Sequence, residues 1–167
     1  MKNSIEFRLK PIGSEIAKVG EKGESFLKSH GLSDHDIQTQ IMVIKELINS
    51  GKTFESQKPA GNEMSVHIFV EKDTITAEIR RSVKESANDH QLQALDKTIQ
   101  WIRGYQDPFA PYMAIASQAS GAAIGDNDSN SFGLAKIAYE AGAILDFYVS
   151  EDNTLNLSAV SHVKGDH

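Results

Sequence analysis

The chain has 167 residues, a formal net charge of −6 and a sequence pI of about 5.5, with 40% hydrophobic and 24% charged residues. This composition predicts one soluble globular domain over residues 1–167, and the acidic balance argues against nucleic acid or an anionic membrane surface as the main partner. The absence of cysteine excludes disulfides and thiolate metal sites, and the lack of a long apolar run predicts a cytoplasmic protein with no membrane span or signal peptide.

The first half of the chain shows the periods of one strand, two helices and a β-hairpin. Apolar and polar residues alternate over residues 5–9, which predicts a half-buried strand. Apolar residues at helical spacing predict helices over Ser14–Gly31 and Ser33–Gly51, each with a serine as N-cap. Alternation resumes over residues 65–72 and 75–83, which predicts a hairpin.

The second half of the chain combines helices with a second hairpin. Apolar residues in helical phase predict a helix over residues 91–105. The following stretch is dense in Ala, Ser, Gly and Asp, and predicts a short helix after Pro111 and then a loop. A further helix is predicted over residues 132–143, and a hairpin over residues 144–163 with its turn at Asp152–Asn153.

This order of elements has no regular alternation of strand and helix. It therefore predicts an α+β fold, a two-layer sandwich with helices on one face of a mixed, mostly antiparallel sheet. The chain shows no internal repeat and no linker, so a single domain is expected.

Three stretches in this order resemble the Bergerat (GHKL) ATP-binding fold of histidine-kinase catalytic domains, anti-sigma factor serine kinases, gyrase B and Hsp90. "ELINSGKTF" (46–54) resembles the N box, a helix that presents a Glu and an Asn. "SNSFGLAKIAYE" (129–140) resembles the glycine-bearing end of the ATP lid. "ILDFYVSEDNTLNLSAV" (144–160) resembles the closing hairpin, so the resemblance extends over nearly the whole chain.

The resemblance implies a site for ATP and Mg²⁺. It gives Glu46 the catalytic role of activating a nucleophile, and Asn49 the role of binding the Mg²⁺ ion that bridges the phosphates. Lys52, Gly133 and Leu134 complete the nucleotide site that the resemblance implies.

Two features depart from the family pattern. Glu46 and Asn49 are three residues apart, whereas the family places Asn four residues after Glu, a position held here by Ser50. The family reads adenine with an Asp-x-Gly-x-Gly segment, but the corresponding "EIRRSVKES" (78–86) contains neither Asp nor Gly. These departures predict that ATP binding is altered or lost, and that the protein works without a cofactor if it is lost.

The resemblance and its departures together predict a bacterial signalling regulator that acts by protein–protein binding. The implied partner is a STAS-domain or response-regulator-like protein, and a homodimer is left open. The alternative is an active ATP-dependent serine/threonine protein kinase of the anti-sigma factor type that acts on a STAS-like partner. A third option is a module that binds another small anion through Arg80, Arg81 and Lys52.

Other possible sites carry weaker signals. Asp126–Ile137 begins like an EF-hand loop but lacks the required Gly and Glu, which favours a solvated acidic loop. No two of the six histidines have zinc-motif spacing, and His67 alternates with Val66 and Ile68 in a predicted strand, so a surface position is expected for His67. For Trp101, Tyr105 and Phe109 core packing is favoured, with a partner-binding patch as the alternative.

Overall fold

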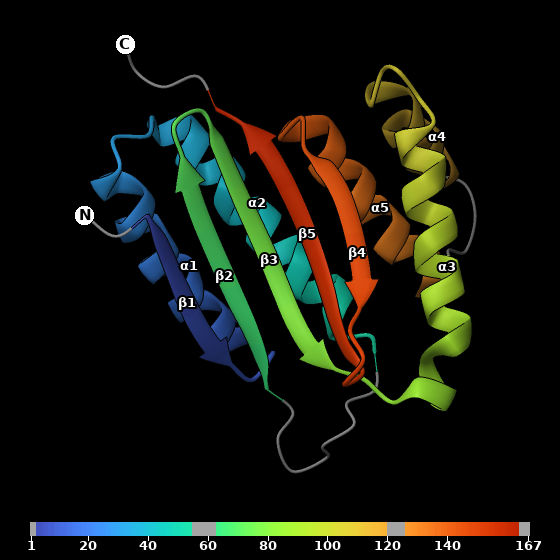
Figure 1. Ribbon diagram of the computed structural model, residues 1–167. Coiled ribbons are helices and arrows are strands. Elements are labelled where there is room, and N and C mark those ends of the chain that lie inside the picture. Colours follow the sequence, from blue (N-terminus) through green and yellow to red (C-terminus); the bar gives the residue numbers. More distant parts are fainter. Residues whose placement is uncertain (1–2, 55–62, 120–125, 164–167) are drawn as a thin grey trace.

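The computed structural model describes residues 3–54, 63–119 and 126–163, which form five strands and five helices (Figure 1). In chain order these elements are β1 (Ser4–Leu9), α1 (Gly13–Ser29), α2 (Asp34–Gly51), β2 (Met64–Glu71), β3 (Thr74–Ser82), α3 (Glu85–Arg103), α4 (Phe109–Ala119), α5 (Asp126–Glu140), β4 (Ile144–Val149) and β5 (Thr154–His162).

The strands form one sheet in the order β1-β2-β3-β5-β4, and all four pairings are antiparallel. Figure 1 shows α1, α2 and α5 behind this sheet, with α3 and α4 beyond the β4 edge. The predicted α+β class and two-layer architecture are therefore confirmed. The predicted hairpin turn is also confirmed, because Asn153 adopts a left-handed φ of 59° between β4 and β5.

The two faces of the sheet differ in character because side chains alternate along each strand. On β3, Ala77 and Ile79 are at most 1% exposed and face the helices. Glu78 and Arg80 project from the opposite side, which no described element covers. This uncovered side, called the open face below, carries mostly polar and charged residues.

Helix α2 lies over the middle of the sheet and packs against β3 and β5. Ser33 acts as its N-cap as predicted, since its Oγ accepts a hydrogen bond from the Asp36 backbone N at 3.1 Å. Ile44, Leu47 and Ile48 are at most 1% exposed. Burying each such side chain contributes about 1.5–3 kcal/mol before the cost of ordering it.

The last residue of α2 makes the closest approach between the two layers. A Cβ atom added at Gly51 would lie 2.4 Å from Ile79 Cδ1 on β3 and 3.5 Å from Met64 Cε on β2. Both of these side chains are at most 2% exposed, so neither has free space to move into. Gly51 therefore sets the distance between the end of α2 and the sheet.

Three helix starts differ from the prediction. Helix α1 begins at Gly13 after Ile12, with no side-chain cap, so Ser14 is not its N-cap. Helix α3 begins at Glu85, six residues before the predicted start. Helix α5 begins at Asp126, where a loop was predicted. In α3 and α5 the extra turns are polar, and packing of the apolar turns that follow outweighs their weak helix propensity.

The predicted short helix after Pro111 is present as α4, although it starts two residues earlier. Proline is tolerated there because the first turn of a helix does not need its N–H group. Among the described residues, no helix is long and apolar enough to cross a membrane.

Replacing Gly51 by alanine should destabilise the fold by about 1–2 kcal/mol, because the added methyl group overlaps Ile79 and outweighs the better helix propensity of alanine. Urea unfolding followed by circular dichroism measures this loss. In an Ile79→Val background, which removes Cδ1, the same substitution should cost about 1 kcal/mol less. Gly13→Ala, with no neighbour within 4 Å of the new Cβ, is the matched control and should change stability by less than about 0.5 kcal/mol. An equal cost in both Ile79 backgrounds would show that the contact does not set the layer distance.

Candidate functional site

The end of α2 presents different residues to its two sides. Glu46 is half-buried and Ser50 is only 4% exposed, whereas Asn49 and Lys52 are exposed. A helix turns 100° per residue, so Glu46 and Ser50, four residues apart, share the side that faces the other helices. Asn49 lies on the solvent side, in line with the exposed Lys45.

Helix α5 crosses α2 next to Glu46. A Cβ atom added at Gly133 would lie 2.5 Å from Glu46 Oε2, so the carboxylate rests against the backbone of α5, and a larger residue at position 133 would displace the end of this side chain. Leu134 is 1% exposed and borders the same inter-helix space as Ser50. The structure thus brings Glu46, Gly133 and Leu134 to one place and leaves Asn49 and Lys52 outside it.

Gly133 lies in the middle of α5 and not before its first turn. Because the helix begins at Asp126, the backbone N–H groups near Leu134 belong to the helix interior. They are therefore not the free N–H groups of a helix start, which a phosphate would need. The predicted start of this helix at residue 132 is therefore wrong, and Gly133 and Leu134 do not lie at a helix start.

A cavity of about 80 Å³ lies between the end of α2, α3 and α5. Gln91 Nε2 on α3 donates a hydrogen bond to the Thr53 carbonyl oxygen at 3.2 Å, and Thr98 Oγ1 lies 3.4 Å from Ser131 Oγ on α5. Sites for small molecules usually measure about 300–1,000 Å³, so a nucleotide bound here would require the three helices to move apart. The cavity is lined by Ser50, Thr53, Phe54, Gln91, Ala94, Leu95, Thr98, Ser131 and Leu134.

The end of β3 carries two arginines on opposite faces. Arg81, two residues beyond Ile79, is 4% exposed on the helix side, and burial lowers its pKa from the ordinary value. Arg80 lies on the open face, where the hydrogen bond from its Nε to Glu78 Oε1 at 2.6 Å raises its pKa. This stretch, in which the resemblance would place an adenine-binding carboxylate, carries two cations instead. The anion site proposed for Arg80, Arg81 and Lys52 is not assembled on one face.

No group of three or more His, Asp or Glu side chains suited to a metal ion occurs in the described part of the chain. The EF-hand reading of Asp126–Ile137 is wrong, because this stretch forms most of helix α5, whereas an EF-hand loop must wrap around its ion. The solvated-loop interpretation of the same stretch is wrong for the same reason. The surface position expected for His67 is met only in part, because this side chain on β2 is half-buried and its Nδ1 is buried, whereas His35, His90 and His162 are exposed.

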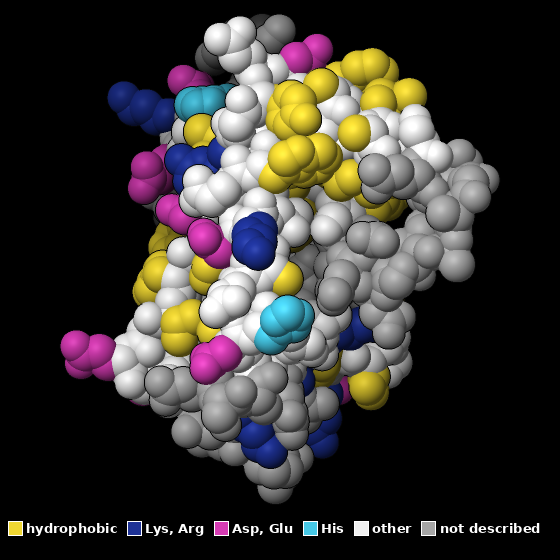
Figure 2. All heavy atoms as spheres, turned by 90° about the vertical axis from the view of Figure 1, so that its right-hand side faces the viewer, with side chains coloured by type: hydrophobic (Ala, Val, Ile, Leu, Met, Phe, Trp, Pro, Cys, Tyr) yellow, Lys and Arg dark blue, Asp and Glu magenta, His cyan; other side chains and the backbone are white. Residues whose placement is uncertain are grey.

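Five large apolar side chains, called the aromatic patch below, form an exposed cluster near the end of α3, the start of α4 and the end of α5. Their exposed fractions are 39–43%, so core packing is the wrong interpretation of Trp101, Tyr105 and Phe109. Figure 2 shows hydrophobic side chains gathered on the upper part of this side of the molecule. The aromatic patch consists of Trp101, Tyr105, Phe109, Met113 and Tyr139.

Contacts between rings hold part of the aromatic patch. Tyr139 lies 5.1 Å from Phe109 and 4.9 Å from Tyr112, measured between ring centroids. Tyr112 also lies 5.6 Å from Phe132, which precedes Gly133 on α5. These contacts fix the orientation of the exposed rings, because aromatic pairs in such geometry contribute about 0.5–1.5 kcal/mol each.

An apolar groove of about 320 Å³ runs beside the aromatic patch, between the end of α3 and the start of β4. Ile144 on its rim is 56% exposed. The groove is lined by Ile102, Arg103, Tyr105, Pro108, Ala138, Gly142, Ala143, Ile144 and Leu145.

No protein-family model matches the sequence, and no curated protein matches it. Among solved structures, the chain is similar to a chain of the SiaB–SiaC complex from Pseudomonas aeruginosa, with a TM-score of 0.66. The match has 17% sequence identity and covers 95% of this chain and 89% of that chain. At this identity the likeness establishes a shared fold.

Ser50 and Thr53 are the cavity residues at the end of α2 that the resemblance did not point to. The sequence did contain the information that Ser50 is buried. The apolar stripe of α2 includes Leu47 and Ile48, and the helical phase places Ser50 near this buried side. Thr98 and Ser131 had no such signal, since only the tertiary packing of α3 on α5 brings them together.

A double-mutant cycle should detect the contact between Glu46 and Gly133. Gly→Ala inside a helix ordinarily stabilises by about 0.5–1 kcal/mol. In the native chain, Gly133→Ala should fail to stabilise, because the new methyl group displaces the Glu46 carboxylate. In a Glu46→Ala background the gain should return, with a coupling free energy of about 1 kcal/mol. Urea unfolding of the four proteins measures this coupling, and a coupling near zero contradicts the contact.

Proposed function

We propose that this chain is a bacterial signalling regulator that acts by binding another protein, on a histidine-kinase-like ATPase (GHKL) fold whose ATP binding is altered or lost. The observation that carries this proposal is the aromatic patch, with five large apolar side chains exposed together. The similar fold in the SiaB–SiaC complex supports it, because that structure contains two proteins bound to each other.

The chemistry of the aromatic patch suits a protein ligand. Trp and Tyr are enriched among the residues that carry the binding energy of protein interfaces, since their rings bury a large area and lose little conformational entropy. The contacts of the Tyr139 ring with Phe109 and with Tyr112 lower that entropy cost further. The neighbouring groove adds a concave apolar surface that a side chain of a partner can fill.

Three features support altered ATP binding. Buried Arg81 stands in the stretch that supplies a carboxylate to adenine in the resembling family, and an arginine offers only donors. Asn49 points to solvent on α2, with Ser50 on the side that faces the cavity. The cavity itself measures only about 80 Å³.

The partner class is tested by titrating the protein with purified STAS-domain and receiver-domain proteins of its own organism in a calorimeter. Binding of one of them is expected, and Trp101→Ala or Phe109→Ala should weaken it at least tenfold, about 1.4 kcal/mol or more. Ile12→Ala is the matched control, because Ile12 is 53% exposed but lies before α1, outside the aromatic patch. Unchanged affinity in both patch variants would show that the aromatic patch does not contact the partner.

The alternative function is an active ATP-dependent serine/threonine kinase, which is favoured by the Glu46 carboxylate resting against Gly133 beside the cavity. Calorimetry with ATP and Mg²⁺ separates the two functions. Altered or lost binding predicts a Kd weaker than about 1 mM. The kinase predicts micromolar affinity and phosphate transfer to the STAS-like partner, abolished by Glu46→Gln and by Asn49→Ala. If phosphate transfer persists in both variants, neither Glu46 nor Asn49 contributes to it.

A further inference from the structure

Strand β1 forms one edge of the sheet. It pairs with β2 on one side, and in the described part of the chain no strand lies on its other side (Figure 1). An edge strand presents backbone N–H and C=O groups that have no partner in the sheet, and such an edge can accept a further strand. The edge of β1 therefore has the backbone chemistry to extend the sheet.

The hydrogen bonds of the sheet determine which backbone groups of β1 point outward. The backbone N of Val70 donates to the Asn3 carbonyl oxygen at 2.7 Å, and these two residues lie opposite each other when the register of β1 and β2 is extended by one residue. Hydrogen-bonded and non-hydrogen-bonded pairs alternate along an antiparallel ladder. Ser4, Glu6 and Arg8 therefore direct their N–H and C=O groups away from β2, whereas the residues between them bond to it.

A groove of about 310 Å³ runs along this outward edge, between β1 and α1. Helix α1 folds back along β1 (Figure 1), so its side chains border the groove. Val19 is 4% exposed and Phe7 is half-buried, and together they give the groove an apolar floor. Lys18 and Lys22 are exposed on its helix side. A strand added to β1 would cover this groove and contact both lysines.

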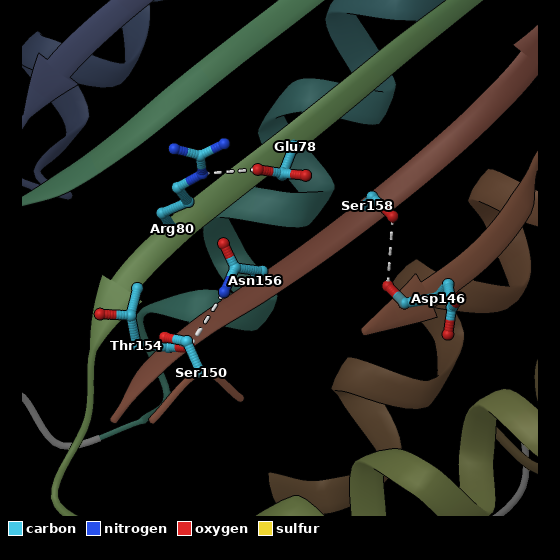
Figure 3. A network of polar contacts seen from close by, with 7 residues as sticks. All are labelled: Glu78, Arg80, Asp146, Ser150, Thr154, Asn156 and Ser158. Carbon is cyan, nitrogen blue, oxygen red and sulfur yellow. Dashed lines mark hydrogen bonds and ion pairs between the residues drawn. The ribbon is translucent and has the colours of Figure 1, made fainter. Parts of the chain in front are cut away.

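The two lysines beside the groove are not neutralised by other side chains. Neither Lys18 nor Lys22 forms an ion pair with any residue that the structure describes. Arg80 on the open face differs in this respect, because Glu78 holds it at 2.6 Å, as the dashed line in Figure 3 marks. The helix side of the groove therefore attracts negative charge, which a ligand would have to supply.

The spacing of the lysines matches that of side chains on a strand. Lys18 and Lys22 are one helical turn apart, about 6 Å along the axis of α1. Side chains on one face of a strand are two residues apart, about 6.6–7 Å. An added strand turns every second side chain toward α1, so two acidic residues separated by one residue would meet the two lysines.

Glu15 limits how far this acidic pattern extends. It lines the groove one turn before Lys18, and its Oε1 accepts a hydrogen bond from the Lys10 backbone N at 3.3 Å. A third acid in line with the first two would lie near the Glu15 carboxylate and be repelled. The groove therefore selects two acids and not a longer acidic run.

We infer that the edge of β1 binds an extended acidic segment of a partner protein, which adds an antiparallel strand to the sheet and places two alternate Asp or Glu side chains on Lys18 and Lys22. Backbone hydrogen bonds to Ser4, Glu6 and Arg8 supply affinity, and the lysines select the sequence. The aromatic patch lies beyond the opposite edge of the sheet, so this inference does not rest on the function proposed for the patch.

The sequence preference is tested by selection from a phage library of random peptides of about nine residues, long enough to extend along all of β1. Peptides enriched on the full chain should carry two acids separated by one residue, among β-branched residues that favour a strand. The double variant K18E/K22E should instead enrich Lys or Arg at this spacing. K28E, a reversal of an exposed lysine in the last turn of α1, is the control and should retain the acidic pattern. No enrichment, or an acidic pattern that persists in K18E/K22E, would overturn the inference.

Strand pairing is tested with N-methylated versions of the enriched peptide in a calorimeter. Opposite residues of an antiparallel pair have their side chains on the same face. Ligand residues that bond to Glu6 therefore project from the open face, and the acids between them direct their N–H groups outward. N-methylation of the acids should leave the affinity unchanged, whereas N-methylation of the residues between them should abolish binding. Equal loss in the two peptides, or loss only on methylation of the acids, would overturn the inference.

The edge itself is tested with Glu6→Pro. Proline removes the outward N–H group without removing a hydrogen bond to β2, so it should weaken peptide binding about tenfold or more. Glu6→Ala keeps the N–H group and is the matched control, and circular dichroism checks the fold of both variants. Equal affinity in these two variants would overturn the inference. So would a change in the sedimentation of the native chain caused by Glu6→Pro, because the occupant of the edge would then be a second copy.

Two sets of variants distinguish this site from the aromatic patch. K18E/K22E should lose the acidic peptide and keep its affinity for the partner titrated above, whereas Trp101→Ala should do the reverse. Loss of both ligands in either variant would overturn the independence of the two sites. Failure of the peptide experiments with an intact, patch-dependent partner complex would overturn this inference and leave the proposed function standing.

Discussion

The arrangement of the whole helical layer depends on how closely the end of α2 approaches the sheet. Gly51 lies directly over Ile79 and Met64, so the axis of α2 is fixed at a distance that no larger residue would allow. Helix α5 then packs on α2 through Gly133, and α3 and α4 pack against α5. The cavity forms where these helices diverge beyond the end of α2. The two glycine contacts therefore hold α2 and α5 in the positions between which the cavity lies.

Much of the fold could be predicted from the sequence because apolar residues recur at regular spacing in its helices and strands. The alternation in β1, β2 and β3 and the apolar stripe of α2 each identify one buried face, and the structure has these elements where they were expected. The starts of α3 and α5 could not be predicted in this way. Residues 85–90 and 126–131 are mostly Ser, Asp, Asn and other polar residues with weak helix propensity, and they are helical because the apolar turns that follow them are packed.

The candidate site was only partly predictable. The resemblance pointed to Glu46 and Gly133, which lie 87 positions apart in the chain and are in contact in the structure. It gave no way to choose between Asn49 and Ser50, because that choice depends on which side of α2 faces α5. The helical phase does contain this information: Asn49 follows the exposed Lys45 by four residues, as Ser50 follows Glu46. A motif comparison considers only the identities of residues, whereas burial depends on the direction in which each side chain points around the helix axis.

The two glycine contacts of α2 also suggest how distant relatives of this chain could be recognised. A larger residue at position 51 is compatible with the fold only if position 79 becomes smaller, and a larger residue at position 133 is easier to accommodate if position 46 becomes smaller. Selection acting on this packing would preserve the combined volume of each pair while the individual residues drift. Covariation at these two pairs would then persist among homologues after the motif residues have been replaced.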